Sequence, residues 1–413
     1  MAATLDHGGE ALPIALPTRA RSLGLQAAFL FYTGGFYLYS VLVYHGMPAF
    51  MRGFLVLGAA ACIPLVGLPY LKVVRHPGSR RMIDVLIWLM LGYFFVWMLV
   101  VGAPARHPGE FRNYVGSIIS WIMLFMLGRS VPVYSKGLTS LAWVVLAGMV
   151  VLTVANTENG AFTPAQSPDT YATYQAYALV VAIVSFVLLY EVKRAVLFWI
   201  IAVSAVILFA ILGSRSEMVA ALLAILVVVN LRRISASKLI LHIGAGAALV
   251  AAFIALTSTG WNRLVNLVDE GAASAISSRF DASREALATI ARYPLTGDFA
   301  SYPAGFYAHN ILSVWVDFGL VGIVLYSVLL FVSIWALLLG APAALRERKT
   351  VVAVALWWFC AVLLLLTKAG DYFIVPFVMG LIASHCAIRS PRTARAPRHR
   401  GEPCPSGGRE GAM

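Results

Sequence analysis

Residues 308–331 read AHNILSVWVDFGLVGIVLYSVLLF, and this stretch decides the class of fold. From Ile311 onward its 21 positions hold a single charged residue, Asp317. A helix needs about 20 mainly apolar residues to cross a hydrocarbon core of about 30 Å. A run of this length therefore predicts a membrane-spanning helix, and its unbroken apolar character does not fit the alternation of a barrel strand.

Runs of the same kind recur along the whole chain. Hydrophobic residues make up 61% of the 413 and charged residues only 12%, whereas a soluble domain carries roughly 25% charged residues. We predict an all-α polytopic transmembrane helical bundle of about 12 spans, at residues 23–43, 51–71, 82–102, 113–131, 138–155, 175–190, 195–212, 216–231, 239–257, 310–340, 351–367 and 371–388.

The distribution of lysine and arginine predicts the orientation of these spans. With the N-terminus in the cytoplasm, every inner loop is basic, and the inner side holds 22 of the 31 basic residues. This matches the positive-inside rule, and one miscounted helix would invert the pattern after it. We therefore expect both termini to be cytoplasmic.

A formal net charge of +13 is typical of a nucleic-acid-binding protein, but the predicted topology gives a different explanation for this charge. The inner surface carries 22 basic and seven acidic residues, whereas the outer surface carries nine basic and ten acidic residues. The basic charge therefore faces the anionic lipids of the inner leaflet. We expect membrane lipids as partners and no nucleic acid.

We divide the chain into five segments. These are a cytoplasmic N-terminal segment at 1–22, spans one to nine at 23–257, an external loop at 258–309, spans ten to twelve at 310–388, and a basic, disordered cytoplasmic tail at 389–413. The sequence has no motif for a metal or nucleotide site and no clustered Cys and His ligands, so we expect no metal and no cofactor.

The external loop contains a predicted amphipathic helix at residues 279–292. Phe280, Leu287, Ile290 and Ala291 fall near one of its faces, and Pro294 ends it. Such a helix is expected to lie along the outer membrane interface, with its arginines at the level of the headgroups.

Polar residues with the chemistry of a site follow this helix. His309, Ser313 and Asp317 are four residues apart and share one helix face, which runs inward by about 12 Å. An acidic residue at that depth indicates a functional site, or else a structural pair with a neighbouring helix. His309 is either a catalytic base or an ordinary interfacial histidine.

Two further polar turns lie at the same predicted outer face. Arg215 and Glu217 sit on the very short turn between the predicted spans 195–212 and 216–231, where an arginine either serves the site or extends to the headgroups. Lys368 and Asp371 lie on the turn between the last two predicted spans, and they either contribute to the same site or form a plain polar turn. Arginines offer bidentate donors to a diphosphate, and a histidine moves a proton near neutral pH.

The stretch SSRFDASREALATIARYPLTGDF, followed by AHNILSVWVDFGLVGIVLY, resembles the hallmark of the O-antigen ligase/polymerase family. The matching positions are Arg279, Pro294 to Gly297, His309, Asn310, Asp317, Gly319 and Gly322, and the turn at Arg215 resembles the family's "SR" motif. The likeness covers roughly residues 210–335. This chain has Ser283 and Arg284 where the family often carries a Trp, and GDFAS where it prefers Gly-x-Gly.

The resemblance implies a bundle of the C-type glycosyltransferase kind in the bacterial inner membrane, with its active site facing the periplasm. Such enzymes transfer a glycan from an undecaprenyl-diphosphate-linked donor to a lipid A-core or lipid-linked glycan acceptor. It implies that Arg215 and Arg279, or Arg284, hold the diphosphate and that His309 is the general base. Asp317 would complete the catalytic set, with Asn310 and Asp371 as secondary candidates.

Alternatives of different classes remain open at this point. The donor chemistry suits an O-antigen ligase, an O-antigen or exopolysaccharide polymerase, or a pilin O-oligosaccharyltransferase. A lipid-linked glycan flippase would show matched, broken spans in two halves, which the sequence does not show. A scaffold without catalysis would leave the cluster of His309, Asp317 and the arginines unexplained.

Overall fold

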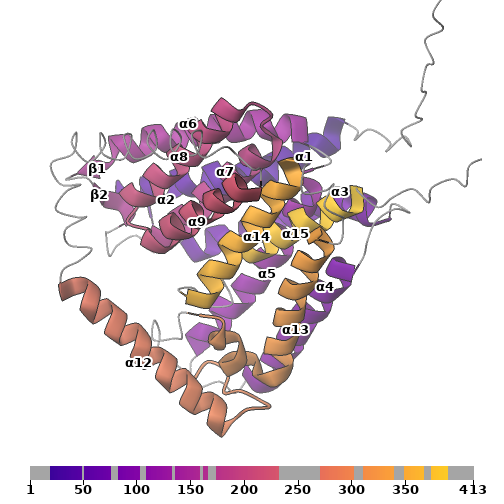
Figure 1. The fold of residues 1–413 in the computed structure, drawn as a ribbon, viewed down its shortest axis with the longest axis vertical. Coiled ribbons are helices and arrows are strands. Elements are labelled where there is room, and N and C mark those ends of the chain that lie inside the picture. The colour runs from indigo at the N-terminus through magenta and orange to yellow at the C-terminus, as the bar shows by residue number, and fades with distance from the viewer. Residues whose placement is uncertain are drawn as a thin grey trace, which may run out of the picture.

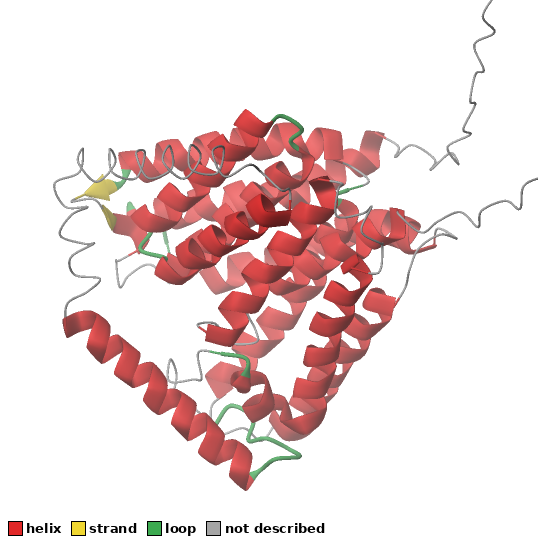
Figure 2. Ribbon diagram, viewed as in Figure 1, coloured by secondary structure: helices red, strands yellow, loops and turns green. Residues whose placement is uncertain are grey.

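A computed structural model describes residues 19–48, 51–75, 82–102, 108–132, 135–158, 161–165, 174–231, 270–301, 310–338, 348–366 and 374–388. Within these ranges the fold is mostly helical, as Figure 2 shows. The exception is a short antiparallel hairpin of β1 (Thr157–Glu158) and β2 (Ala161–Phe162), in which Thr157 pairs with Phe162.

The helices follow the apolar runs of the sequence. They are α1 (Arg19–Leu30), α2 (Phe36–Tyr44), α3 (Met51–Arg75), α4 (Met82–Trp97), α5 (Pro108–Ser130), α6 (Ser135–Ala155), α7 (Tyr174–Glu191), α8 (Ala195–Ile211), α9 (Arg215–Leu231), α12 (Glu270–Arg292), α13 (Leu312–Leu338), α14 (Arg348–Leu366) and α15 (Ile374–Ile388). Two π-helical turns, η1 (Phe31–Gly35) and η2 (Met98–Gly102), join α1 to α2 and extend α4, and the 3-10 turn η3 (Thr163–Ala165) follows β2.

The prediction of an all-α, polytopic helical membrane protein is confirmed. Among the described residues, seven helices are long and apolar enough to cross a bilayer, and four shorter apolar helices accompany them. Each predicted span coincides with a helix except residues 239–257, which lie outside the described residues. The count of twelve therefore stays a prediction, as do the terminal segments 1–18 and 389–413.

The closest helix crossing joins α5 to α15 through two glycines. A Cβ atom at Gly128 would lie 2.0 Å from the carbonyl oxygen of Phe377, and one at Gly380 would lie 2.2 Å from that of Phe125. Small residues allow backbones to approach in this way in a membrane, where dispersion contacts rather than the hydrophobic effect hold helices together. This crossing positions α5, which carries part of the candidate site.

A buried ion pair joins α4 to α5 near the end of the bundle that is predicted to be cytoplasmic. Arg129 donates from Nε and Nη2 to the two carboxylate oxygens of Asp84, at 3.1 and 3.0 Å, and both side chains are almost fully buried. The sequence analysis counted both charges as part of the inner surface. The structure corrects this, because the two charges neutralise each other inside the bundle.

The span predicted at residues 310–340 corresponds to α13, which is long and apolar enough to cross a bilayer but contains a break that was not predicted. Gly319 has φ 63° and ψ −167°, so the backbone leaves the helix there and α13 consists of two helical pieces. The sequence analysis missed this break because one glycine within a long apolar run is compatible with a continuous helix.

The amphipathic helix α12 begins at Glu270, nine residues before the predicted start. In Figure 1 it runs along the lower left edge of the molecule, and it contacts α13. Ala286 and Ile290 are buried against Val316 of α13, whereas Leu287 is 55% exposed and Ala291 is also exposed. Of the predicted apolar face, Ile290 therefore packs on α13 together with Ala286, whereas Leu287 and Ala291 do not.

Candidate functional site

Two of the described candidate residues lie near the start of α13, where Asp317 is in the first piece of the helix and Asn310 precedes it. A third, Arg284, lies on an exposed side of the neighbouring α12. His309 and Asp371 lie outside the described residues. Arg215 and Arg279 occupy positions in α9 and α12, but their side chains are also outside the description.

Asp317 is a buried carboxylate that holds two other segments of the chain. Its side chain accepts a hydrogen bond at Oδ2 from the hydroxyl of Tyr114 on α5, and one at Oδ1 from the backbone N–H of Ala300, at 3.2 Å. Asp317 is only 5% exposed. A buried carboxylate needs such donors, because an unsatisfied one is costly in an apolar setting.

The hydrogen bond to Ala300 stabilises an unusual backbone conformation. Ala300 has φ 54°, and it is the one non-glycine residue with positive φ among the described residues. L-residues adopt this left-handed region at a cost of roughly 1–2 kcal/mol. Asp317 therefore fixes the turn just before residues 302–309, the segment that ends in His309.

The break at Gly319 exposes backbone carbonyls that the neighbouring α4 satisfies. Trp97 donates from Nε1 to the carbonyl oxygen of Asp317 at 3.2 Å, and the Tyr93 hydroxyl donates to that of Phe318 at 2.8 Å. Freed carbonyls in the apolar region of a membrane need partners from other helices. The aromatic donors of α4 make the break a stable feature.

The turn at residues 294–298 interlocks with this break. The N–H of Asp298 donates to the carbonyl oxygen of Val316 at 2.6 Å, and the N–H of Leu320 donates to that of Leu295 at 3.2 Å. Gly297 has φ 68°, and a Cβ atom there would lie 2.2 Å from the Val316 oxygen. A Cβ atom at Gly319 would lie 2.2 Å from the Leu295 oxygen.

Aromatic rings pack on Tyr114, the donor to Asp317, and on Phe318, its neighbour in the chain. Phe318 stacks on Phe94 with 3.8 Å between ring centroids, and Phe299 lies 4.9 Å from the Tyr114 ring and 5.8 Å from the Phe318 ring. These contacts exclude water from the carboxylate and its donors. Electrostatic interactions gain strength in such a low-dielectric setting.

Helix α12 is attached to this centre along one face. Trp315 donates from Nε1 to the carbonyl oxygen of Pro294 at 2.8 Å, and the Asn310 amide donates to the Ser283 hydroxyl at 3.2 Å. Asn310 also caps α13, because its Oδ1 accepts the N–H of Leu312 at 3.0 Å. Asn310 thus links the start of α13 to α12.

The two candidate arginines of α12 occupy different sides of that helix. Position 279 falls four residues before Ser283, which contacts Asn310, so helical periodicity places it on the face that meets α13. Arg284 is exposed and lies about 100° around the helix from Ser283. The helix register therefore favours Arg279 over Arg284 as the residue next to the start of α13.

The turn before α9 has its own internal hydrogen bonds. Gly213 has φ 77°, and the buried Glu217 accepts hydrogen bonds from the Ser214 and Ser216 hydroxyls at 2.5 and 2.8 Å. An acidic residue in the first turn of a helix is stabilised by the N-terminal end of the helix dipole. Glu217 thus stabilises the start of α9, where Arg215 is the first residue.

The sequence analysis missed Tyr93, Trp97 and Tyr114, which hold the Asp317 region. The aromatic run at residues 93–97 and Tyr114 flank the short connection between the predicted spans 82–102 and 113–131, but nothing in the sequence pairs this connection with Asp317. Among the described residues, no group of three or more His, Cys, Asp or Glu side chains could hold a metal ion. Comparisons of the chain with protein-family models and with curated proteins found no match.

Proposed function

We propose that this chain is a membrane glycosyltransferase of the bacterial inner membrane. It would transfer a glycan from an undecaprenyl-diphosphate-linked donor to an acceptor sugar at the periplasmic face. One observation carries the proposal. The segments that jointly resemble the O-antigen ligase/polymerase hallmark, the turn at Pro294–Gly297 and the break at Gly319, interlock through reciprocal backbone hydrogen bonds.

The proposed reaction is a displacement at the anomeric carbon of the donor. His309 accepts the proton of the acceptor hydroxyl as that oxygen forms the new glycosidic bond. The bond from the anomeric carbon to the phosphate oxygen breaks, and undecaprenyl diphosphate leaves. Arg215 and Arg279 stabilise its negative charge through bidentate hydrogen bonds.

Asp317 has a positioning role in this proposal. Its carboxylate already accepts hydrogen bonds from Tyr114 and from Ala300, so it is engaged with the protein rather than directed at a substrate. Through Ala300 it fixes the chain that leads to His309. We therefore propose Asp317 as a positioning residue, although the resemblance implies a place for it in the catalytic set.

The α12 helix supports a role at the membrane surface. Its inner face packs on α13, whereas Leu287 on its other side is exposed together with Tyr293 and Leu295 beyond the helix end. A helix with apolar residues on its free side suits the interface between lipid and water. It would lie beside the path by which a lipid-linked donor reaches His309.

The test is a glycan analysis of a strain that lacks this chain and is complemented with variants. His309→Ala should insert normally and fail to restore the surface glycan. His45→Ala is the matched control, because His45 is an exposed histidine that bonds Asn156 at 2.7 Å, away from α13. Restoration of the wild-type pattern by His309→Ala would overturn the assignment.

The same gel separates the ligase from the polymerase. Lipid-linked polymer together with an unmodified lipid A-core indicates a ligase, whereas single repeats on the core, or loss of exported polymer, indicate a polymerase. Purified protein in proteoliposomes excludes the flippase alternative if it joins glycans without moving lipid-linked glycans across the bilayer.

A further inference from the structure

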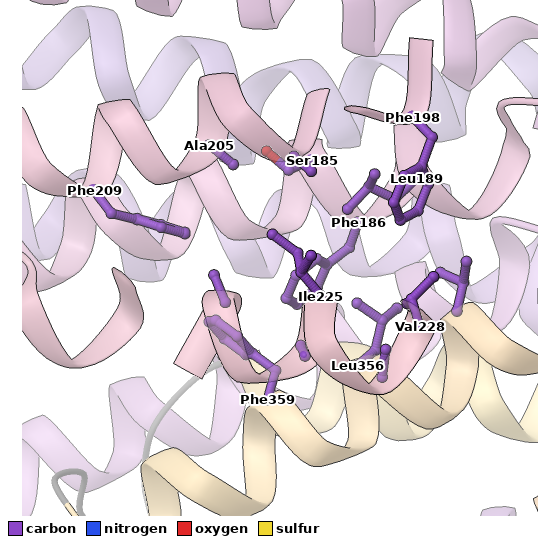
Figure 3. Close-up of a pocket in the computed structure, with 15 residues that line it drawn as sticks. Ser185, Phe186, Leu189, Phe198, Ala205, Phe209, Ile225, Val228, Leu356 and Phe359 are labelled. Carbon is purple, nitrogen blue, oxygen red and sulfur yellow. The ribbon is translucent and has the colours of Figure 1, made fainter. Parts of the chain in front are cut away.

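A cavity lined by apolar residues lies among α7, α8, α9 and α14 (Figure 3). Its walls include Phe198 and Phe209 of α8, Ile225 of α9 and Leu356 of α14, and Ser185 of α7 is the one polar residue among the fifteen that line it. α7 and α14 are long and apolar enough to cross a bilayer, and α8 and α9 are shorter apolar helices, so these apolar surroundings suit a ligand from the bilayer.

The size of the cavity selects the kind of occupant. It has about 470 Å³ of unfilled space, its open side included. Along α8 the lining runs from Phe198 to Phe209, a rise of about 16 Å. A helix of that length and about 10 Å in diameter needs roughly 1,200 Å³. Even with its open side included, this space is too small for another helix, so its occupant has to be slimmer, as a single hydrocarbon chain is.

Basic residues lie at one end of the cavity, on the helices that form its walls. Arg194 precedes α8 and stands four residues before Phe198, and Arg348 begins α14 and stands four residues before Val352. Arg348 and Val352 share a helix face, because both lie in α14 and are four residues apart. Arg194 is the extended N-cap residue of α8 and lies next to its first turn. The guanidinium of Arg348 lies 5.3 Å from the centre of the Phe198 ring, directly at the cavity wall.

The charge at this end is clearly positive. The described ranges 191–194 and 348–349 hold four basic residues and one acidic residue, Glu191. Glu191 is already paired with Lys349 at 2.8 Å. Lys193 and Arg194 are exposed beside that pair. An anionic group placed here meets an excess of positive charge.

We infer that this is a binding site for an anionic phospholipid. Its phosphate would lie against Arg194 and Arg348, and one acyl chain would extend along Phe198 into the cavity. Basic pockets between helices at the cytoplasmic side of a membrane recognise anionic headgroups in this way. The site is separate from the Asp317 region, and its test does not depend on glycosyl transfer.

The test counts lipids that the full chain retains in detergent, by native mass spectrometry. Phosphatidylglycerol and phosphatidylcholine with identical acyl chains are added in separate arms, and inorganic phosphate in a third. We expect retention of one phosphatidylglycerol, at least about fivefold above phosphatidylcholine, because each arginine near a headgroup contributes that factor. Inorganic phosphate should neither bind nor displace the lipid.

Variants separate the chain site from the headgroup site. Ala205→Leu fills the cavity from α8, and Val196→Leu is its control because Val196 is 70% exposed on the same helix. Arg348→Gln removes the headgroup contact, Arg348→Lys should restore part of it, and the exposed Arg75→Gln on α3 is the charge control. We expect Ala205→Leu and Arg348→Gln to lose the retained lipid and both controls to keep it.

Two results would overturn the inference. One is equal retention of phosphatidylglycerol and phosphatidylcholine, which would show that the charge does not select the lipid. The other is full retention by Ala205→Leu, which would show that the chain lies elsewhere. If Ala205→Leu does not fold, Ala224→Leu fills the same cavity from α9 and decides the matter in the same assay.

Discussion

Gly297 and Gly319 face each other across a contact that leaves no room for a side chain at either position. Both have positive φ, 68° and 63°, and a Cβ atom on either would lie 2.2 Å from a carbonyl oxygen of the opposing segment. The contact locks the turn after α12 to the break in α13. We call this contact between Gly297 and Gly319 the joint. Any motion of α12 relative to α13 therefore has to move or break it.

Gly319→Ala is expected to disrupt the joint. The backbone of Gly319, at φ 63° and ψ −167°, lies in a region that is essentially restricted to glycine and costs other residues about 1–3 kcal/mol, and the approach to the Leu295 oxygen adds to this. We expect a lower thermal midpoint in detergent and loss of the surface glycan in the complementation assay. Gly92→Ala on α4 is the control, because a Cβ atom there meets nothing within 4 Å. Equal behaviour of the two variants would contradict the close contact.

The helices themselves were predictable from the sequence, because an apolar run long enough to cross a bilayer indicates a membrane-spanning helix. The break at Gly319 was not, since its cause lies in the carbonyl of Leu295 and in the donors Tyr93 and Trp97, which are far away in the sequence. The apolar face of α12 was assigned from hydrophobicity, which favours Leu287. The packed face uses Ala286, because a small residue allows α13 to come close.

For the candidate site, the sequence identified Asp317 and Asn310 but not their partners. The hydroxyl of Tyr114 reaches Asp317 across 203 residues, and no local pattern encodes such a pairing. The sequence also left a functional and a structural role open for Asp317. Its contacts anchor the turn at Ala300, and a functional role for the carboxylate stays a prediction.

The bond between Tyr114 and Asp317 predicts a coupled pair of variants. Tyr114→Phe removes a hydrogen bond to a charged group, worth about 1.5–3 kcal/mol. Asp317→Asn keeps the size of the side chain and removes the charge. In a double-mutant cycle of thermal stability, the double variant should lose less than the sum of the two single variants. Additive losses would show that the two side chains act independently.

The ion pair between Asp84 and Arg129 predicts an asymmetry between single and double variants. Removing one partner leaves a buried charge, so Asp84→Leu or Arg129→Met alone should lose about 3–5 kcal/mol of stability. The double variant should recover most of this loss. The yield of folded protein after detergent extraction measures the loss in each single variant and the recovery in the double variant.

A matched control comes from the second ion pair. Lys349 Nζ and Glu191 Oε1 are 2.8 Å apart, but the lysine side chain is 36% exposed, so Lys349→Gln should cost less than about 1 kcal/mol.

If the double variant of Asp84 and Arg129 gives as little folded protein as either single variant, the prediction is contradicted, and the pair contributes more than charge compensation.

The positions of the two arginines around α12 predict which of them binds the diphosphate of the donor. Position 279 lies one turn before Ser283, which bonds Asn310 beside His309, whereas Arg284 is exposed about 100° away. We expect Arg279→Gln to lower transfer at least about tenfold, the size of a lost hydrogen bond to a charged group, and Arg284→Gln to lower it less than threefold. Transfer is measured with purified protein and a lipid-linked donor at several concentrations. If Arg284→Gln has the larger effect, the free face of α12 meets the diphosphate, and the helix must turn or shift on its joint when the donor binds.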